Sequence, residues 1–513
     1  MNIVFRVDSS IEMGIGHVMR CLTLADALRD EGEQCHFVCR EHPGNVMDQI
    51  VSHGYQVYSL PLSQADQFVE GESTGKSQLA HAHWLGCDWL SDARQTMSCI
   101  GALNADWLVV DHYGLDERWE KLLRPACNKI MVIDDLADRH HDCDLLLDQT
   151  FGRLTQDYEG LFPAKCSLLT GAKFALLRPE FAELRDYSLQ RRKNSRFENL
   201  LISMGGIDKD NATGKVLKFL KEVSLPRQCR ITIVMGENAP WLDEVKSLAE
   251  TLPWPAEVKA NVVNMAQIMA DSDLAIGAAG GTSWERCCMG LPSIVLSYAE
   301  NQMFLAETLG RSGIHWYIGD LEDICGDGLR SAVKHASIAS SSLSCLSINS
   351  SNICDGKGST RVVRTLIGCD LELELATLDD ADVLFLWRND PSIRKHFFDS
   401  KEISIEEHLA WFENSLNKSD RVLLVAYLNK MPIGCLRFDL EDKVAEISIY
   451  LNPIAVGKGL GTQILRSGTK WLKKNYSDVE NINALVLRDN VASQKAFLDA
   501  GYDLNCLKYV KQL

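Results

Sequence analysis

A histidine follows two closely spaced glycines near the amino terminus. In FRVDSSIEMGIGHVMR a strand pattern ends near Asp8, and a helix pattern begins at about Gly16-His17. Glycine lets the backbone approach a ligand closely, and the free N–H groups that open a helix favour phosphate. Because imidazole has an ordinary pKa of about 6.5, His17 at this point could take a proton from water near neutral pH. Taken alone, it is better explained as a capping or packing histidine. A dinucleotide-binding turn is disfavoured, since Met19 stands where the third glycine would be.

Two later glycine turns could also bind phosphate groups. SMGGIDKDNATGK places Gly205-Gly206 where a diphosphate can face the backbone, and GAAGGTSWERCCMG places Thr282 and Ser283 at a turn. Glu285 follows one helical step later, where a carboxylate can accept both hydroxyl groups of a ribose. A first-turn glutamate stabilised by the helix dipole also explains this residue.

Further polar residues stand at predicted turns. Asn301 and Gln302 in YAENQ can bond sugar hydroxyl or amide groups, or can belong to a plain polar loop. Four aspartates end strand patterns on the same expected edge, and Tyr113 follows one of them; the four are Asp8, Asp111, Asp134 and Asp135. One of them could orient His17, as carboxylates do for catalytic imidazoles, although capping of the next helix is the preferred interpretation for each.

The elements that must position these residues alternate between strand and helix. Apolar runs such as NIVFRV, DWLVVD and KIMVIDD, followed by helical patterns, predict a parallel sheet covered on both faces within residues 1–190. A second alternation, from LLISMGG to LPSIVLSY, predicts another such lobe over residues 191–368. The fold class is therefore α/β, with a cleft facing the carboxyl ends of both sheets.

The serine-rich segment 336–360 is expected to be a long loop, and a helical run follows it.

From residue 369 to 513 the pattern restarts as a small α+β unit. AEISIYLNPIAVGKGLGTQIL reads as a strand, a glycine turn and an amphipathic helix. Gly457, Gly459 and Gly461 would present successive N–H groups to a pyrophosphate. Asn490 and Ser493 open a second predicted helix downstream. Glycine turns are common, so neither segment is specific alone.

Charge and composition restrict the partners. The 513 residues carry 53 Lys and Arg against 70 Asp and Glu, a net charge of −17, which argues against nucleic acid and anionic membranes. No secretory signal pattern or membrane-spanning run is visible, so we expect a cytoplasmic protein whose 17 cysteines stay reduced, with no metal site. The oligomeric state is not predicted.

Residues 1–368 resemble one known family. The Gly-x-Gly-His turn, the Gly-Gly-x-Asp-x-x-Asn-x-Thr segment and the stretch from Gly-Gly-Thr-Ser-Trp-Glu to Glu-Asn-Gln look like the UDP-2,4-diacetamido-2,4,6-trideoxy-β-L-altropyranose hydrolases of pseudaminic acid biosynthesis. These enzymes are related to GT-B glycosyltransferases. The resemblance implies that water attacks the anomeric carbon of a UDP-linked sugar without a metal, and it implies roles for ten residues. His17 would be the general base in the turn of Gly14 and Gly16, Glu285 would hold the ribose, and the others would contact the remaining UDP-sugar: Gly206, Met265, Thr282, Ser283, Asn301 and Gln302.

The tail resembles the GNAT N-acetyltransferases, which implies acetyl-CoA as cosubstrate. Their pyrophosphate loop aligns with residues 456–461, that is Val456, Gly457, Lys458, Gly459, Leu460 and Gly461, and Asn490 and Ser493 match the following helix motif. Two positions depart from the family pattern. Val456 replaces the usual arginine or glutamine, and Phe497 replaces the tyrosine that often serves as general acid, which leaves the proton donor unassigned.

The residues of the tail that would contact the acetyl acceptor are indicated by less specific sequence patterns. Glu446, on the strand before the glycine turn, is the candidate base, although a surface glutamate explains it equally well. LWRNDPSIRKHFF resembles acceptor-side segments of sugar-amine N-acetyltransferases, which implies that Trp387, Arg388 and Asn389 contact the acceptor.

Together the two resemblances predict a bifunctional enzyme: the tail acetylates a UDP-4-amino sugar, and the front hydrolyses the product. Three alternatives remain open. The front could be a GT-B glycosyltransferase, the chain could be a non-catalytic nucleotide-sugar sensor, or the tail could acetylate a protein N-terminus.

Overall fold

The chain folds into two compact units, Met1–Val363 and Arg364–Leu513. The computed structural model describes residues 1–62, 79–193, 197–298, 300–320, 327–338, 340–367, 371–428, 430–457 and 459–504. The division between the units falls inside a helix, α13 (Gly358–Ile367), a few residues before residue 369.

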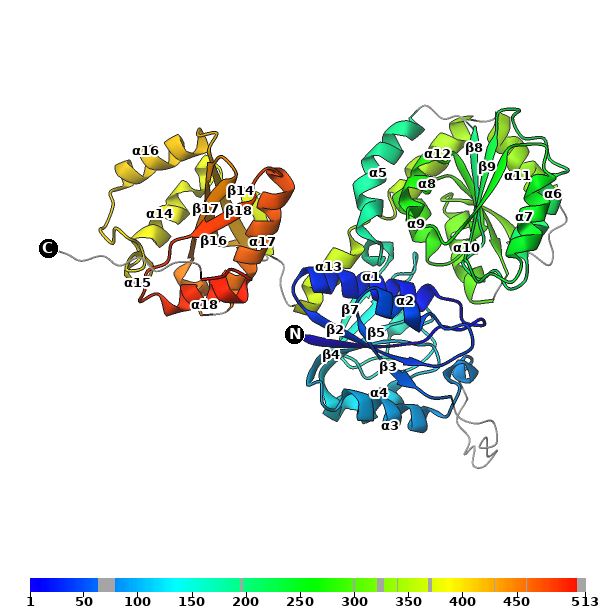
Figure 1. Cartoon of the computed structure of the whole chain (residues 1–513), viewed down its shortest axis with the longest axis horizontal. Coiled ribbons are helices and arrows are strands. Elements are labelled where there is room, and N and C mark those ends of the chain that lie inside the picture. Colours follow the sequence, from blue (N-terminus) through cyan, green and yellow to red (C-terminus); the bar gives the residue numbers. More distant parts are fainter. Residues whose placement is uncertain are drawn as a thin grey trace. The chain divides into compact units, whose positions relative to one another are not determined.

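The first lobe of the first unit is a parallel seven-stranded sheet in the order β3-β2-β1-β4-β5-β6-β7. Its near-continuous apolar strands are buried on both faces, as expected for a parallel sheet. In Figure 1, α1 and α2 lie on one side of this sheet and α3 and α4 on the other. The strands are β1 (Asn2–Val7), β2 (Gln34–Arg40), β3 (Gln56–Leu60), β4 (Ala105–Asp111), β5 (Cys127–Ile133), β6 (Leu145–Asp148) and β7 (Ser167–Thr170), and the helices are α1 (Gly16–Asp30), α2 (Met47–Ser52), α3 (Trp89–Ile100) and α4 (Glu117–Leu123).

The second lobe repeats this design with a parallel six-stranded sheet in the order β10-β9-β8-β11-β12-β13. The helix α5 (Pro179–Arg192) spans the expected lobe boundary at residue 190. The strands are β8 (Asn199–Ser203), β9 (Arg230–Met235), β10 (Ala256–Ala260), β11 (Leu274–Ala278), β12 (Ser293–Ser297) and β13 (Trp316–Asp320), and the helices are α6 (Ala212–Leu220), α7 (Leu242–Glu250), α8 (Met265–Asp271), α9 (Thr282–Cys288), α10 (Glu300–Arg311), α11 (Asp327–Ile338) and α12 (Ser340–Ser351). The predicted pair of Rossmann-like lobes is therefore confirmed.

Strand order places the glycine turns at the ligand-binding edge. In each lobe the chain winds outward in both directions from two central strands, β1 and β4 in the first and β8 and β11 in the second. Open parallel sheets bind ligands beyond the carboxyl ends of such neighbouring strands. The turns that carry Gly14, Gly206 and Gly280 follow β1, β8 and β11 directly, so the topology brings them to these edges.

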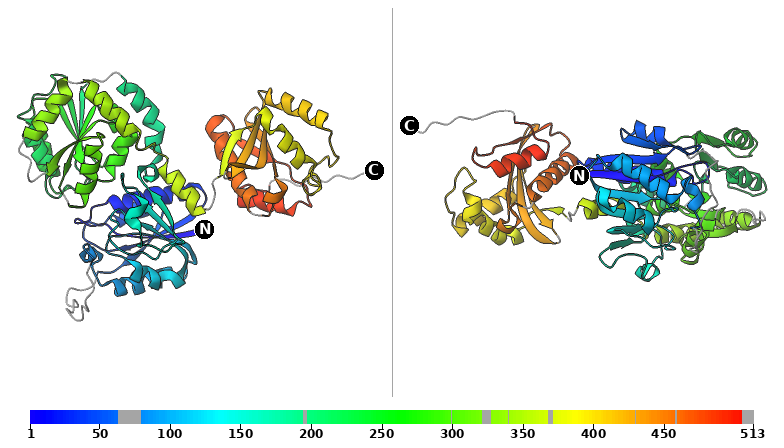
Figure 2. Two further views of the ribbon diagram at one scale, coloured as in Figure 1. Left: turned by 180° about the vertical axis from the view of Figure 1, so that it is seen from behind. Right: turned by 90° about the horizontal axis from the view of Figure 1, so that it is seen from below.

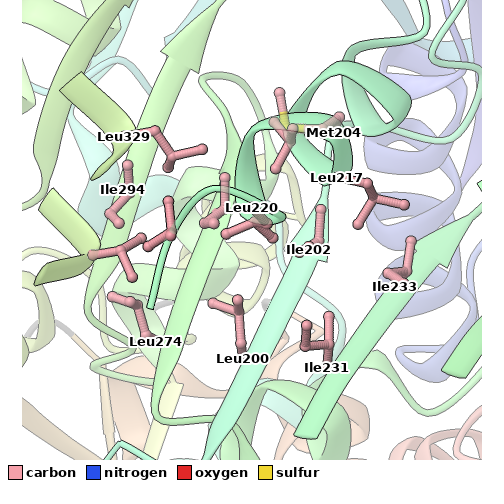
Figure 3. Packing of buried hydrophobic residues seen from close by; sticks show 14 of the residues in the cluster. Leu200, Ile202, Met204, Leu217, Leu220, Ile231, Ile233, Leu274, Ile294 and Leu329 are labelled. Carbon is pink, nitrogen blue, oxygen red and sulfur yellow. The ribbon is translucent and has the colours of Figure 1, made fainter. Parts of the chain in front are cut away.

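A tightly packed core supports the second lobe. Figure 3 shows Leu200 and Ile202 of β8 packed between neighbouring strands and the side chains of α6. Leu200, Ile202 and Leu217 of α6 are at most 1% exposed. Because Gly205 and Gly206 follow β8 after one residue, this packing fixes where their turn begins.

The serine-rich segment is not the loop expected from its composition. Its described residues include the end of α11, all of α12 and the first residues of α13, and Leu343 and Leu346 of α12 are buried. Serine has only a modest intrinsic cost in a helix, and burial of the leucines against the second lobe outweighs it. The helix predicted after this segment is confirmed as α13.

The second unit is a five-stranded sheet in the order β14-β15-β16-β17-β18. Its strands pair antiparallel except for β17 and β18, which are parallel. Figure 2 shows the helices of this unit around its sheet. The strands are β14 (Leu371–Leu375), β15 (Arg421–Leu428), β16 (Met431–Glu441), β17 (Val444–Leu451) and β18 (Asn481–Ala484), and the helices are α14 (Ala381–Asn389), α15 (Pro391–Arg394), α16 (Ile405–Leu416), α17 (Leu460–Asn475) and α18 (Val491–Asp499).

Candidate functional site

His17 stands in the first turn of α1, as the glycine pattern predicts. Its Nδ1 lies 2.6 Å from Oδ1 of Asp111, at the end of the neighbouring strand β4. The imidazole side chain is 13% exposed, whereas the Asp111 side chain is fully buried. A carboxylate that accepts the Nδ1 proton leaves Nε2 as the basic nitrogen of the ring. Capping of the next helix was the preferred role for Asp111, and the structure shows that this was wrong: its carboxylate faces His17 instead.

Arg20, one helical turn after His17, donates hydrogen bonds to Asp111 and Asp135. Its guanidinium donates from Nε to Oδ2 and from Nη2 to Oδ1 of Asp111, each at 2.7 Å, and from Nη1 to Oδ2 of Asp135 at 2.6 Å. Burial alone would raise the pKa of Asp111, but the charges of Arg20 and His17 outweigh it and hold the pKa well below its usual range. Asp111 therefore stays ionised beside the imidazole.

An aromatic cluster lies against the histidine. The Tyr113 ring meets the His17 ring edge-on, with centroids 4.6 Å apart, and stacks on Trp84 at 5.8 Å. Trp84 belongs to the short 3-10 helix η2 (Ala82–Leu85), and His81 lies 4.5 Å from its ring. The Tyr113 hydroxyl donates to Asp135 at 2.7 Å. Burial and then Asp135 raise the pKa of Tyr113 well above its ordinary value, so it remains a neutral donor.

Glycine turns of both lobes meet near His17. Gly14 has φ +77°, and added Cβ atoms at Gly14 and Gly16 would meet nothing within 4 Å. An added Cβ at Gly206 would lie 3.1 Å from the Ile15 side chain, so the turn after β8 touches the turn after β1. The glycine turns of the two lobes therefore lie in contact beside His17.

The turn after β11 is open toward its ligand side. Gly280 and Gly281 have nothing within 4 Å of an added Cβ, and Gly280 has φ +147°. The hydroxyl of Ser283 is buried and accepts from Gly280 N–H at 3.3 Å and from Arg286 at 3.1 Å. Thr282 also accepts from Arg286, at 3.1 Å. Both hydroxyls are acceptors in these bonds and keep their own O–H donors, so the turn can offer hydroxyl as well as backbone N–H groups to an anion.

Glu285 lies one turn into α9. Its side chain is 19% exposed, and Oε1 is 3.9 Å from Nη2 of Arg178, which precedes α5. Burial raises the pKa of Glu285 to about 7, and the positive charge of Arg178 opposes that effect only in part.

Three remaining predicted contacts differ in what they offer. The Met265 side chain is buried at the start of α8, so only its backbone can face a ligand. Gln302 accepts the N–H of Tyr298 at 3.3 Å, and Tyr298 donates to the carbonyl of Met204 at 2.8 Å. The side chain of Asn301 lies outside the described residues.

Two of the acidic strand ends are structural. Asp8 is buried and accepts from the Arg6 guanidinium at 2.6 Å and from the backbone N–H of Arg40 at 2.7 Å. Asp134 is also buried and accepts from the Ala137 N–H at 2.9 Å and from Arg139 at 2.8 Å. Neither carboxylate is hydrogen-bonded to His17.

The second unit has a gap between two strands. β18 pairs with β17 only from Val444 to Ile447, whereas β17 continues to Leu451. Glu446 is exposed, opposite Asp439 on β16 and Asn483 on β18. It lies on the paired side of the point where the strands part.

The glycine turn before α17 has the geometry of an anion cradle. Gly457 and Gly459 have φ +80° and +73°, and an added Cβ at either would meet nothing within 4 Å. Val456 is 49% exposed, and Leu460 and Gly461 begin the helix. Lys458 lies outside the described residues. The turn therefore leaves room beside the N-terminus of a 16-residue helix, where the phosphates of a coenzyme A would fit.

Asn490 and Ser493 cap α18, because the Asn490 Oδ1 accepts the N–H of Ser493 at 3.1 Å. Phe497, four residues after Ser493 in the same helix, is buried against Tyr502, with ring centroids 5.1 Å apart. The structure thus places Phe497 in the core and assigns no proton donor there.

The expected acceptor-side residues divide into two kinds. Trp387 is buried in the core, and Asn389 bonds both the N–H and the carbonyl of Ile403 with its amide. Arg388 lies over the Phe397 ring at 4.0 Å and donates to the Asp399 carbonyl at 2.8 Å, but its Nη1 is buried without a partner. Of the three, only Arg388 offers a donor to a ligand.

Sequence reasoning missed Arg20, Trp84 and Arg178. The spacing of Arg20 was informative, because a residue three positions after His17 shares its helical face. Trp84 stands in the aromatic run HAHWL, but no local pattern tied that run to the histidine.

Among the described residues no group of three or more His, Cys, Asp or Glu side chains is arranged to hold a metal ion. In the same part of the chain no helix is both long and apolar enough to cross a bilayer.

Known proteins resemble both units of the chain. The family model of the GNAT acetyltransferase domain matches residues 370–503. The UDP-2,4-diacetamido-2,4,6-trideoxy-beta-L-altropyranose hydrolase of Campylobacter jejuni is 27% identical over 61% of this chain and 97% of its own length. The acetyltransferase PseH of the same organism is 28% identical over 22% of this chain and 71% of its own length.

Two further similarities concern the whole chain and the fold. An uncharacterized protein of Methanocaldococcus jannaschii is 25% identical over 98% of this chain and 96% of its own length. MurG of Acinetobacter baumannii has the same fold over 72% of this chain and 99% of its own, with 14% identity and a TM-score of 0.52. The chain therefore combines a GT-B-like α/β region, similar to the hydrolase, with a C-terminal GNAT acetyltransferase domain.

Proposed function

We propose that the chain is a bifunctional enzyme of pseudaminic acid biosynthesis. Its first unit hydrolyses UDP-2,4-diacetamido-2,4,6-trideoxy-β-L-altrose to UDP and free sugar, and its GNAT domain acetylates the 4-amino group of the preceding UDP-sugar with acetyl-CoA. The two Campylobacter relatives support one reaction each. The observation that carries the hydrolase is the His17–Asp111 pair, at 2.6 Å, where the turns of the two lobes meet.

In the hydrolysis, water is the nucleophile and His17 is the general base. Nε2 takes a proton from the water as its oxygen bonds to the anomeric carbon. The bond from that carbon to the diphosphate oxygen breaks, and UDP leaves with the bonding electrons. Asp111, kept ionised by Arg20, stabilises the imidazolium that forms.

The second lobe holds UDP in this proposal. Glu285 accepts the ribose hydroxyls, and the backbone at Met265 lies beside the uracil. N–H groups in the turns of Gly206, Thr282 and Ser283 bind the diphosphate, where open glycines and the start of α9 favour negative charge. The sugar lies between these turns and those of Gly14 and Gly16, and Asn301 and Gln302 contact it.

In the GNAT domain, the turn around Gly457, Gly459 and Gly461 would bind the pyrophosphate of acetyl-CoA, together with Val456, Lys458 and Leu460. Asn490 and Ser493 orient α18 beside the gap between β17 and β18. The acceptor nitrogen attacks the thioester carbonyl, the carbon–sulfur bond breaks, and coenzyme A leaves as the thiol while the amine loses a proton. Glu446, directly or through water, is the proposed base, and Arg388 and Asn389 lie on the acceptor side.

The first test is UDP release from UDP-2,4-diacetamido-2,4,6-trideoxy-β-L-altrose by wild type and His17→Ala. We expect release with free sugar as the second product, and a loss of at least about a hundredfold in kcat for the variant, since general-base catalysis contributes this much or more. His140→Ala, which changes an exposed histidine of the same lobe, is the matched control and should keep wild-type activity.

Different results would separate the parts of the proposal. Absence of UDP release by wild type would reject this substrate. Release that needs an added alcohol would identify a glycosyltransferase. Undiminished release by His17→Ala would remove His17 from the mechanism while leaving the hydrolase in place.

A further inference from the structure

A half-buried tryptophan stands beside the proposed general base and takes no part in the proposed mechanism. Trp84, in the short helix η2, has its ring centroid 6.4 Å from that of His17 and 5.8 Å from that of Tyr113. Residues far apart in the chain thus bring an indole to the point where the water of the hydrolysis would be activated. The indole is close enough to His17 to contact a sugar held there.

Two contacts fix η2 over the turns that follow β1 and β4. The His83 imidazole lies 3.2 Å from a carboxylate oxygen of Glu12, in the turn after β1. An added Cβ at Gly114, in the turn after β4, would lie 2.9 Å from the carbonyl oxygen of His81, so these two segments touch. Because η2 rests on both turns, the Trp84 side chain is positioned before a ligand binds, which lowers the entropy cost of binding.

One side of the indole is left without a stacked ring. His81 and Tyr113 pack against Trp84, with ring centroids 4.5 Å and 5.8 Å away. Their own centroids are 5.6 Å apart, so both lie on the same side of the indole. The rings of His17 and His83 meet the indole at 85° and 73°, with centroids 6.4 Å and 6.2 Å away, so neither is stacked on it.

The indole N–H of Trp84 is a donor without an acceptor in the described part of the chain. By contrast, Nε1 of Trp119, in the same lobe, donates to Asp92 at 2.9 Å. The carboxylates of Asp111 and Asp135 already accept from other side chains of the proposed site. Since a partly buried tryptophan N–H usually has a partner, an acceptor on a ligand would complete this arrangement.

We propose that Trp84 binds the sugar of the hydrolase substrate: its N–H donates to the carbonyl oxygen of an acetamido group, and its open side packs against the apolar side of the pyranose. The inference rests on the proposed hydrolase function and adds a residue that recognises the substituents of the sugar. An indole combines one donor with an apolar surface. An acetamido sugar offers the complement, an amide oxygen beside C–H and methyl groups.

The experiment measures UDP release and UDP binding by the full chain with Trp84→Phe, which keeps a ring but lacks the N–H, and with Trp84→Leu, which lacks both. We expect KM for UDP-2,4-diacetamido-2,4,6-trideoxy-β-L-altrose to rise about fivefold in the first variant, the size of one neutral hydrogen bond, and about twentyfold in the second. The kcat should stay near the wild-type value, because the contact is made equally before and during the reaction.

Two controls accompany these variants. The Kd of UDP alone should be unchanged in both, because the indole lies on the sugar side, and this binding also shows that the unit is folded. Trp89→Phe changes another half-buried tryptophan of the same lobe and should alter none of the constants.

Other results would overturn the inference in distinct ways. A loss of kcat with KM unchanged would show that Trp84 only positions Tyr113 and His17. Weaker binding of UDP alone would place the contact at the nucleotide. Wild-type constants in both variants would remove Trp84 from the site while the hydrolase stands. Absence of UDP release by wild type would reject the hydrolase function and this inference with it.

Discussion

At the scale of single residues, the proposed hydrolase site pairs a histidine with a buried, ionised aspartate. Asp111 is fixed by Arg20 on both oxygens and still accepts from His17. The Arg20 guanidinium keeps Asp111 from taking up a proton itself, so in the proposed mechanism the proton from water stays on the imidazole. This arrangement resembles that of other histidines oriented by a buried carboxylate, and here the charges of Arg20 and His17 together keep Asp111 ionised.

If Glu285 binds the ribose as proposed, UDP binding should depend on pH. Its pKa is raised to about 7 by burial, so the carboxylate becomes protonated as the pH falls through this value. Only the ionised form can accept both ribose hydroxyls, and we expect the Kd of UDP to increase toward lower pH. Calorimetric titration of UDP between about pH 5.5 and about pH 8.5 measures this dependence.

The matched variant for this prediction is Glu285→Gln, which keeps the shape and does not titrate. UDP has its own titration, but it affects both proteins equally, so the difference between their Kd values reports on Glu285. We expect the difference to be about tenfold above pH 7 and to shrink below it. A constant difference across the range would contradict the proposed ribose contact.

At the scale of elements, both units use a glycine turn that opens a helix. The turns before α1 and α17 contain glycines with positive φ and open space beside them. A left-handed conformation costs an L-residue about 1–2 kcal/mol, and the absence of a side chain also leaves room for a phosphate. The same kind of turn would therefore serve both proposed reactions.

Gly459→Ala should weaken acetyl-CoA binding. The added Cβ would strain a residue at φ +73° and enter the space assigned to the pyrophosphate, so KM for acetyl-CoA should rise about tenfold while UDP release stays unchanged. Gly501→Ala is the control, because Gly501 has φ +92° and equally open surroundings but lies beyond α18. If both variants raise KM alike, general strain rather than lost phosphate binding explains the effect.

At the scale of the whole molecule, the two proposed sites are built from separate compact units. Every described residue assigned to the hydrolase lies in Met1–Val363, and every one assigned to the acetyltransferase lies in Arg364–Leu513. The Methanocaldococcus relative aligns with both units in one chain. Each unit has its own hydrophobic core, so loss of one site should leave the other intact.

A mixing experiment tests this independence. His17→Ala and Gly459→Ala chains should each fail in the conversion of UDP-4-amino sugar to free diacetamido sugar, the second at limiting acetyl-CoA. An equimolar mixture should restore it, because the acetylated intermediate can diffuse from one chain to the other. Free-sugar formation by the mixture is compared with free-sugar formation by the wild-type protein. A mixture that stays inactive would show that the intermediate passes only within one chain.

The sequence by itself determined most of the elements and the order in which they follow one another. Near-continuous apolar strands, helices with apolar faces and glycines at their starts are local features, and they predicted two parallel lobes, a smaller α+β domain and the place of His17 in α1. It also pointed to the resemblance on which the function rests. The short strands β6 and β7 and the serine-rich α12 were missed, because four-residue strands leave little pattern and the helix depends on burial of its leucines.

Only the tertiary structure decided which polar residues act together. Asp8, Asp111 and Asp134 end equivalent strands and look alike in sequence, yet only Asp111 reaches His17. Arg6 binds Asp8, and Arg139 binds Asp134. The choice depends on strand order, since β4 lies beside β1 although the two are separated by about a hundred residues of chain. Hydrogen bonds between neighbouring strands set these partnerships, and no local pattern of residues encodes which strands will be neighbours.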